Sequence, residues 1–164
     1  MTQLAKRVVK YLLLFSSFLL VQVSLIPLLT IYEIAPDLML IGVVLSAIRH
    51  GAIAAIVTGF VAGLAQDAVS THLYGLQALA KAVAGFVAAY FARDKLKFDL
   101  QVTLGIALAA ALAHNVIRDT IYYFDADFGF WYTIIRYVIP NSLYTLALTA
   151  ITHLLFAKSF KRKS

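Results

Sequence analysis

Apolar runs long enough to cross a membrane follow one another through almost the whole sequence, and short segments between them carry most of the charges. A helix needs about 20 apolar residues to cross the hydrocarbon core of a bilayer, and about 17 to 25 are tolerated. The composition agrees with this pattern, because 62% of the 164 residues are hydrophobic and only 13% are charged, which is too apolar for an ordinary soluble domain. We expect an all-α, polytopic helical bundle that forms a single integral membrane domain over residues 1–164.

Six runs qualify as expected membrane spans. The first run follows a basic segment, as in a signal peptide, but it continues without a convincing cleavage site, so we expect it to be retained as a span. The second run is near the minimum length and could be tilted, partly re-entrant or shielded by its neighbours. The expected spans cover about residues 11–32, 36–48, 52–67, 76–92, 102–123 and 131–157.

Connections that contain Lys or Arg alternate with connections that contain neither. The N-terminus, the turn at 49–51, the connection at 93–101 and the C-terminus all contain basic residues, whereas the connections at 33–37, 67–75 and 124–130 contain none. Cytoplasmic loops are enriched in Lys and Arg. The pattern predicts six spans with both termini in the cytoplasm, and hence a multi-pass membrane protein.

Several function classes are excluded or disfavoured by residue type and spacing. The chain has no cysteine, so it has no thiolate zinc site and no cysteine nucleophile, and its four histidines are too scattered to predict a metal cluster. Motifs typical of hydrolases, metalloproteases and nucleotide-binding enzymes are absent from the sequence. The basic excess follows the topology and does not suggest nucleic-acid binding. We therefore expect no enzymatic activity and no cofactor.

The third expected span contains two glycines four residues apart, Gly59 and Gly63, followed one turn later by Asp67. Small residues at this spacing leave one helix face bare, so that another helix can approach closely. Gly85 in the fourth span is a further candidate for such packing. We expect this glycine face to mediate helix packing, either inside the bundle or with a span of a partner protein.

Charged side chains inside spans are costly, and they are functional candidates by default. Five of them are expected within about 8 Å of the outer surface, from their distance to the span ends at 1.5 Å per residue. Two interpretations stay open: the groups snorkel or pair with one another, or they line an outward-facing polar pocket of formal charge +1 that prefers an anionic guest such as a lipid head group. We expect Asp67 to pair with a basic residue, plausibly Lys81. The layer comprises Asp67, Lys81, Arg118, Asp119 and Arg136.

The fifth span has one strongly polar side. His114 and Arg118 are four residues apart and share a helix face, as do Asn115 and Asp119. This side must face protein or water, and hydrogen bonding within the bundle is a commoner role for such residues than proton relay. In the sixth span, Pro140 predicts a kink, and the adjacent Asn141 is a further member of the polar bundle face.

A set of short motifs between about residues 36 and 91 resembles the bacterial rod shape-determining protein MreD family. Their order and spacing carry the resemblance, together with the size of the chain, the six expected spans and the short basic tail. The connection between Asp67 and Gly75 departs from the pattern, because it contains Ser70-Thr71-His72 where more glycine or proline is expected. The motifs are Pro36-Asp37-Leu38, Arg49-x-Gly51, Gly59-x-x-x-Gly63-Leu64-x-x-Asp67, Leu73-Tyr74-Gly75-Leu76-x-Ala78 and Gly85-Phe86.

The resemblance implies a non-enzymatic scaffold or regulatory subunit of the cell-elongation machinery that synthesises lateral peptidoglycan. Its implied partners are MreC, a SEDS-family glycosyltransferase, a class B penicillin-binding protein and membrane lipids. The resemblance also implies a fold similar to the substrate-binding membrane subunits of energy-coupling-factor transporters. That similarity supplies the alternative function, a small-molecule-binding subunit of such a transporter. A small channel or proton carrier is a third possibility, which would require ion flux.

Overall fold

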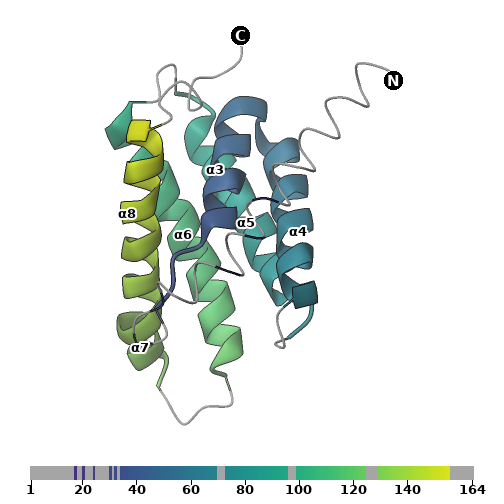
Figure 1. Cartoon of the computed structure of the whole chain (residues 1–164), viewed down its shortest axis with the longest axis vertical. Helices are drawn as coiled ribbons and strands as arrows, with labels where there is room; N and C mark the ends of the chain where they lie inside the picture. Colours follow the sequence, from purple (N-terminus) through teal and green to yellow (C-terminus); the bar gives the residue numbers. More distant parts are fainter. Residues whose placement is uncertain are drawn as a thin grey trace.

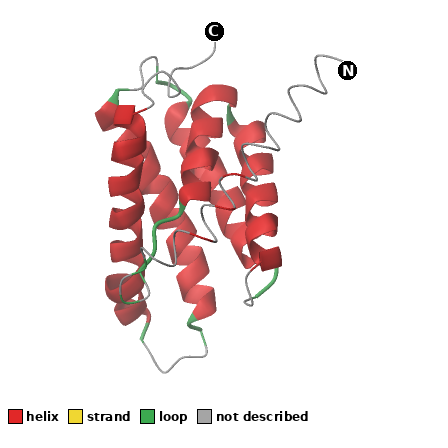
Figure 2. Cartoon of the chain, viewed as in Figure 1, coloured by secondary structure: helices red, strands yellow, loops and turns green. Residues whose placement is uncertain are grey.

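The fold is a bundle of helices, seen in a computed structural model that describes residues 34–69, 73–95, 99–124 and 129–155 and the single positions 17, 20, 24, 30 and 32. The regular secondary structure of these residues is entirely helical (Figure 2). The elements are α3 (Leu38–His50), α4 (Ala52–Val69), α5 (Leu76–Ala92), α6 (Leu100–Tyr122), α7 (Phe130–Thr133), the π-helix η1 (Ile134–Val138) and α8 (Ile139–Leu155) (Figure 1).

These helices cover the five runs predicted from residue 36 onward, with ends that differ by a few residues. Three continuous helical stretches are long and apolar enough to cross a membrane: Ala52–Val69, Leu100–Tyr122 and Phe130–Leu155. The apolar helices α3 and α5 are shorter, with 13 and 17 residues. The predicted span 11–32 lies outside the described residues, apart from five single positions. The expected all-α class is confirmed for the described residues, and the number of spans stays a prediction.

Helices α4, α6 and α7 define one end of the bundle, which is at the bottom of Figure 1 and is called the α7 end below. α4 and α6 end there, and α5 and α7 begin there. Helix α3 is different, because it begins part-way along the bundle after the non-helical segment 34–37 (Figure 1). At 1.5 Å per residue, its 13 residues extend over about 20 Å, less than the roughly 30 Å of a bilayer core.

Glycines bring α4 and α5 into backbone contact, and these two helices share the most extensive interface of the bundle. A Cβ atom on Gly59 would overlap the carbonyl group of Lys81, and one on Gly63 would overlap the backbone at Ala78. Gly85 of α5 lies equally close to the backbone of α4, because a Cβ atom on it would lie 2.6 Å from the carbonyl oxygen of Ala55. All three glycines are buried, so this face is used inside the bundle and leaves no surface for a partner helix.

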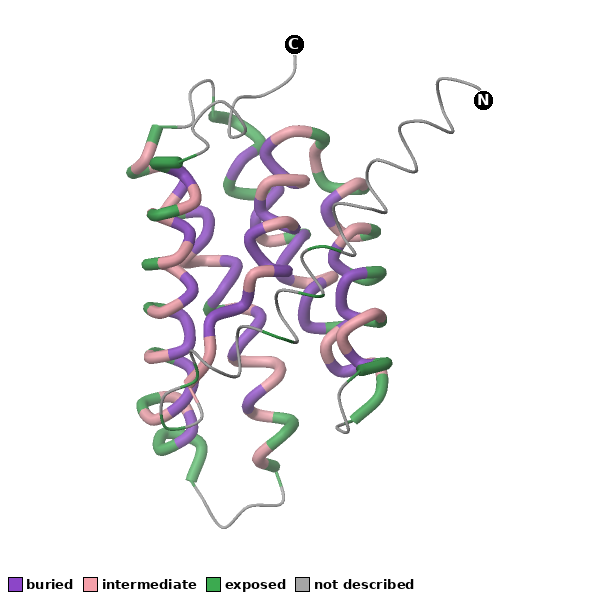
Figure 3. The backbone as a smooth tube through the Cα atoms, in the orientation of Figure 1, coloured by how far each residue is buried: buried purple, intermediate pink, exposed green. Residues whose placement is uncertain are grey.

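Residues on the inward faces of the helices are buried, and large apolar residues on the outward faces are exposed. The inward faces of α3, α5 and α6 form an apolar core rich in alanine, and Figure 3 shows buried backbone concentrated between the helices. Large apolar side chains such as Phe60 of α4, Phe86 of α5 and Leu143 of α8 are exposed. An exposed apolar exterior is expected where lipid, and not water, surrounds the helices.

The expected irregularity at Pro140 takes the form of a π-helix. Proline has no backbone N–H and its ring crowds the carbonyl one turn earlier, so an ordinary α-helical turn cannot continue through it. Immediately before Pro140, the chain widens into η1, where the N–H of Ile139 bonds to the carbonyl of Ile134, five residues back. Such π-turns are frequent at functional sites. Here the turn carries Arg136 and Tyr137 at the α7 end.

Candidate functional site

Lys81 of α5 is the centre of a buried polar network. Its side chain has no exposed surface, and its ammonium group contacts three acceptors from three parts of the chain. These are Asp37 Oδ2 at 2.5 Å, Gln77 Oε1 at 2.9 Å and His114 Nε2 at 3.2 Å. An ammonium has three protons to donate, so each proton has one acceptor. A buried charge placed in this way is paired and fully hydrogen-bonded.

The network continues from His114 through α6 into α8. Nδ1 of His114 lies 3.1 Å from Asn115 Oδ1, which can only accept, so Nδ1 carries the ring proton and Nε2 accepts from Lys81. Nδ2 of Asn115 donates to Ser142 Oγ at 2.9 Å, and Ser142 donates in turn to the carbonyl of Val138 at 2.7 Å. Along this path each donor faces an acceptor, so the hydrogen bonds link α5, α6 and α8. His114 Nε2 also lies 3.1 Å from Gln77 Oε1, the other acceptor of the Lys81 ammonium.

Asp37 holds the segment before α3 at the other side of the network. Its carboxylate caps α3 by accepting from the N–H of Leu40 at 3.1 Å, in addition to its ion pair with Lys81. Its own N–H donates to Thr145 Oγ1 at 3.1 Å, and the N–H of Ala35 donates to Asn141 Oδ1 at 2.9 Å. Non-helical backbone at membrane depth requires protein partners of this kind. Side chains of α8 therefore satisfy the backbone that enters α3.

Asp67 lies at the end of α4, where it holds the start of α5. It is buried, and its two carboxylate oxygens accept from the backbone N–H groups of Gly75 at 3.0 Å, Gln77 at 3.2 Å and Ala78 at 3.1 Å. The first N–H groups of a helix lack partners within the helix, and a carboxylate there also interacts favourably with the helix dipole. Lys81 forms its ion pair with Asp37, so the choice of Lys81 as the partner of Asp67 is wrong. That Asp67 pairs with a basic residue stays a prediction.

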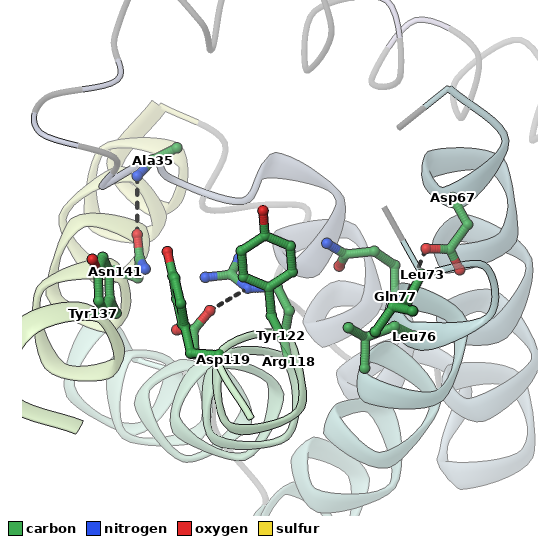
Figure 4. A pocket seen from close by; sticks show the side chains of 11 residues that line it. Ala35, Asp67, Leu73, Leu76, Gln77, Arg118, Asp119, Tyr122, Tyr137 and Asn141 are labelled. Atoms are coloured by element: carbon green, nitrogen blue, oxygen red, sulfur yellow. Dashed lines mark hydrogen bonds and ion pairs between the residues drawn. The ribbon is translucent and has the colours of Figure 1, made fainter. Parts of the chain in front are cut away.

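A cavity of about 310 Å³ opens at the α7 end between α5, α6, α8 and the segment before α3 (Figure 4). Arg118 and Asp119 of α6 lie on its wall and form an ion pair, with Nε of Arg118 2.7 Å from Asp119 Oδ1. Gln77 of α5 and Asn141 of α8 lie on either side of them (Figure 4). Three tyrosines complete the aromatic part of the lining: Tyr122, Tyr123 and Tyr137.

The residues of the expected outer layer therefore separate into different environments. Arg118, Asp119 and Asp67 line the cavity, whereas Lys81 belongs to the buried network and is not part of the lining. Arg136 also lies outside the lining, where it donates to the carbonyl of Tyr32 at 3.3 Å and stacks over the ring of Tyr137.

The polar bundle face has members that the sequence interpretation did not include. His114 and Asn115 face inward as expected, and they are joined by Asp37, Gln77 and Ser142. Asp37 could have been found from its position directly before a short apolar helix, where an aspartate is a favoured N-cap. Gln77 carried no such signal. Within the described parts of the chain, no group of three or more His, Asp or Glu side chains is arranged to hold a metal ion.

Comparison with known families agrees with the motifs. The family model for rod shape-determining protein MreD matches residues 5–161, which is almost the whole chain. Neither the curated proteins nor the solved structures gave a match to the chain. The expected fold similarity to energy-coupling-factor subunits therefore stays a prediction. Because the family match extends from end to end and the described elements are apolar helices, the chain belongs to the MreD family of membrane proteins, which has a role in rod shape determination.

Proposed function

We propose that the chain is a non-enzymatic scaffold or regulatory subunit of the complex that synthesises peptidoglycan during cell elongation. The observation that carries this proposal is the family match over residues 5–161. The contacts of the buried polar groups support it, because Lys81, Asp37 and His114 are directed at one another and at neighbouring helices. These interior contacts stabilise one arrangement of the helices. The outer surface of the bundle therefore has a fixed shape for partner spans.

We propose further that the chain crosses the bacterial inner membrane six times with both termini in the cytoplasm. The alternation of basic connections supports this topology. In this orientation the α7 end, with the cavity, faces outward. A cysteine-accessibility experiment on single cysteines placed at His50 and Gly129 tests the orientation.

The proposed partners are MreC, a SEDS-family glycosyltransferase and a class B penicillin-binding protein. The direct test is purification of the full chain from native membranes in a mild detergent, followed by identification of bound proteins by mass spectrometry. We expect cell-wall synthesis proteins to be recovered in fixed ratios. In parallel, depletion of the chain in a rod-shaped host should give rounded cells, and re-expression should restore rods. Recovery of the partners without any effect on cell shape contradicts the proposal.

One observation favours a second candidate, a small-molecule capture subunit of an energy-coupling-factor-type transporter. The cavity at the α7 end has a volume of about 310 Å³ and is lined by apolar and aromatic side chains together with a few charged and amide groups, as a capture site for a small molecule would be. The same purification separates the two candidates. A capture subunit should be recovered with an ATPase-driven coupling module and should retain a saturable small-molecule ligand, whereas a scaffold should be recovered with cell-wall proteins.

A further inference from the structure

The charges that line the cavity at the α7 end differ from the positive layer expected from the sequence. Lys81 and Arg136 are not part of the lining, so the only cation on the wall formed by the described residues is Arg118. The wall also contains two carboxylates, those of Asp67 and Asp119. This cavity is therefore not a site for a simple anion.

The two carboxylates of the wall differ in whether they have an oxygen atom that a guest could use because it has no hydrogen-bond partner among the described residues. Asp67 uses both oxygens to accept from three backbone N–H groups at the start of α5. Asp119 is 3% exposed, and its Oδ1 accepts from Arg118, but its Oδ2 has no hydrogen-bond partner among the described residues. A buried, unpartnered carboxylate oxygen costs free energy unless a donor reaches it. Asp119 Oδ2 is thus an unpartnered acceptor on a residue of the cavity wall, with almost no accessible surface of its own, so a guest contacts it once the side chain turns toward the cavity.

Arg118 supplies the complementary charge beside Asp119. Its hydrogen bond to Asp119 uses Nε, and its side chain is 21% exposed, so the two terminal nitrogens of the guanidinium remain for a guest. In Figure 4, the guanidinium lies between Asp119 and Gln77, within the space that the labelled residues surround. A guanidinium binds phosphate or carboxylate oxygens through such paired N–H groups.

Aromatic rings form the side of the cavity next to Asp119. Tyr123 of α6 and Tyr137 of the π-helix are stacked, with ring centroids 4.3 Å apart, and Tyr122 meets Tyr123 edge-on at 4.8 Å. The π-helix places Tyr137 in this wall, one turn ahead of Pro140. The Tyr137 ring already contacts Tyr123 and the guanidinium of Arg136. Tyr122 and Tyr123 are the rings that favour an organic ammonium group beside the carboxylate, through cation–π attraction combined with a charge-assisted hydrogen bond.

We propose that this cavity binds a zwitterion in which a primary ammonium is a short distance from a phosphate. The ammonium donates to Asp119 Oδ2 beside the tyrosines, and the phosphate accepts from Arg118. A volume of about 310 Å³ is at the lower end of ligand pockets, so it suits a phosphoethanolamine group and not a whole lipid. Phosphoethanolamine occurs both as a lipid head group and as a free molecule. This inference does not depend on the scaffold function.

The test measures binding to the purified full chain in a non-ionic detergent by native mass spectrometry. The probes are short-chain phosphatidylethanolamine, phosphatidylglycerol, phosphatidylcholine and free phosphoethanolamine. We expect phosphatidylethanolamine to bind about tenfold or more tightly than phosphatidylglycerol, which has no ammonium, and than phosphatidylcholine, whose ammonium has no N–H to donate. Equal binding of the three lipids overturns the proposal, and this comparison requires no variant.

Two variants and a matched control place the site. Asp119→Asn and Arg118→Gln should each weaken phosphatidylethanolamine binding about tenfold or more. Arg93→Gln removes an exposed charge outside the cavity lining and should leave binding unchanged. Wild-type affinity in Asp119→Asn overturns the assignment. Competition by free phosphoethanolamine at a similar concentration identifies a soluble zwitterion as the source, and its failure to compete identifies the lipid head group.

Discussion

The ammonium of Lys81 and a carboxylate oxygen of Asp37 form an ion pair in the interior of the bundle, 2.5 Å apart. The two side chains are 0% and 6% exposed, and the residues are 44 positions apart in the sequence. The pair connects α5 to Asp37, the residue directly before α3. With 13 residues, α3 is shorter than the bilayer core is thick. The ion pair therefore fixes how a partial-length helix sits among longer ones.

Removal of one partner of this pair should destabilise the protein strongly. We expect Lys81→Met or Asp37→Asn to cost about 3–5 kcal/mol, because each leaves an uncompensated charge or broken network in the interior. The double variant should recover part of the loss, since both charges are then absent. Thermal unfolding in detergent measures the effect. Arg93→Gln, which breaks an exposed ion pair with Asp94, is the control and should not change the melting temperature. A double variant that is less stable than both single variants would contradict this account.

The glycine contacts between α4 and α5 predict a position-dependent effect of added methyl groups. Gly63→Ala should destabilise the bundle, and Gly63→Leu should do so more strongly, because the new side chain meets the backbone at Ala78. Gly42 and Gly105 are the matched controls, since each lies in a helix with open space at the Cβ position. Their change to alanine should leave stability equal or slightly higher. Melting temperatures of the alanine variants, compared side by side, decide the point.

The cap formed by Asp67 should be sensitive to the loss of one carboxylate oxygen. Asp67→Asn replaces an acceptor by an NH₂ group, which leaves backbone N–H groups at the start of α5 unsatisfied, and we expect a cost of about 1–3 kcal/mol. Asp99 offers a contrast, because it caps α6 through a single exposed contact with Val102, and asparagine is an equally good N-cap. Hydrogen exchange of residues 75–78 should accelerate in Asp67→Asn. Asp99→Asn should have no effect on stability, and equal effects of the two substitutions would argue against the proposed role.

The backbone of the segment before α3 should exchange its amide hydrogens faster when α8 loses the Thr145 hydroxyl. Thr145→Val preserves shape but removes the oxygen that accepts from the N–H of Asp37, so a buried donor is left without its partner. We expect faster hydrogen exchange in a peptide covering residues 34–38. Thr152→Val is the control, because among the described residues the hydroxyl of Thr152 bonds only to the carbonyl of Leu148 in its own helix. Unchanged exchange in Thr145→Val would show that the segment is held by other contacts.

The helices themselves could be predicted closely because their signals are local. The predicted run 76–92 coincides with α5, and the run 102–123 differs from α6 by one or two residues at each end. Length, hydrophobicity and the spacing of Gly59 and Gly63 can all be read within one segment. The identity of the family was also accessible, since the motifs between about residues 36 and 91 pointed to the family that matches residues 5–161.

The partners of the charged residues could not be predicted in the same way. Asp67 is closer to Lys81 in sequence than Asp37 is, yet Asp37 makes the ion pair and Asp67 caps a helix. Depth estimates place residues at a level in the membrane but give no rotation about the helix axis. For this reason Arg118 and Arg136, both expected in one layer, have different surroundings in the folded chain.

By itself, the sequence determined a chain of apolar helices, the positions at which two of them can touch, and membership of a family that acts in rod shape determination. Each of these depends on the composition and order of neighbouring residues. Only the tertiary structure decided that α3 begins part-way along the bundle and that Lys81 pairs with Asp37. It also decided that one carboxylate oxygen of Asp119, a residue of the cavity wall, has no hydrogen-bond partner among the described residues. The physical reason is that buried polar groups select their partners by the angles at which helices pack, and those angles arise from all the helices together.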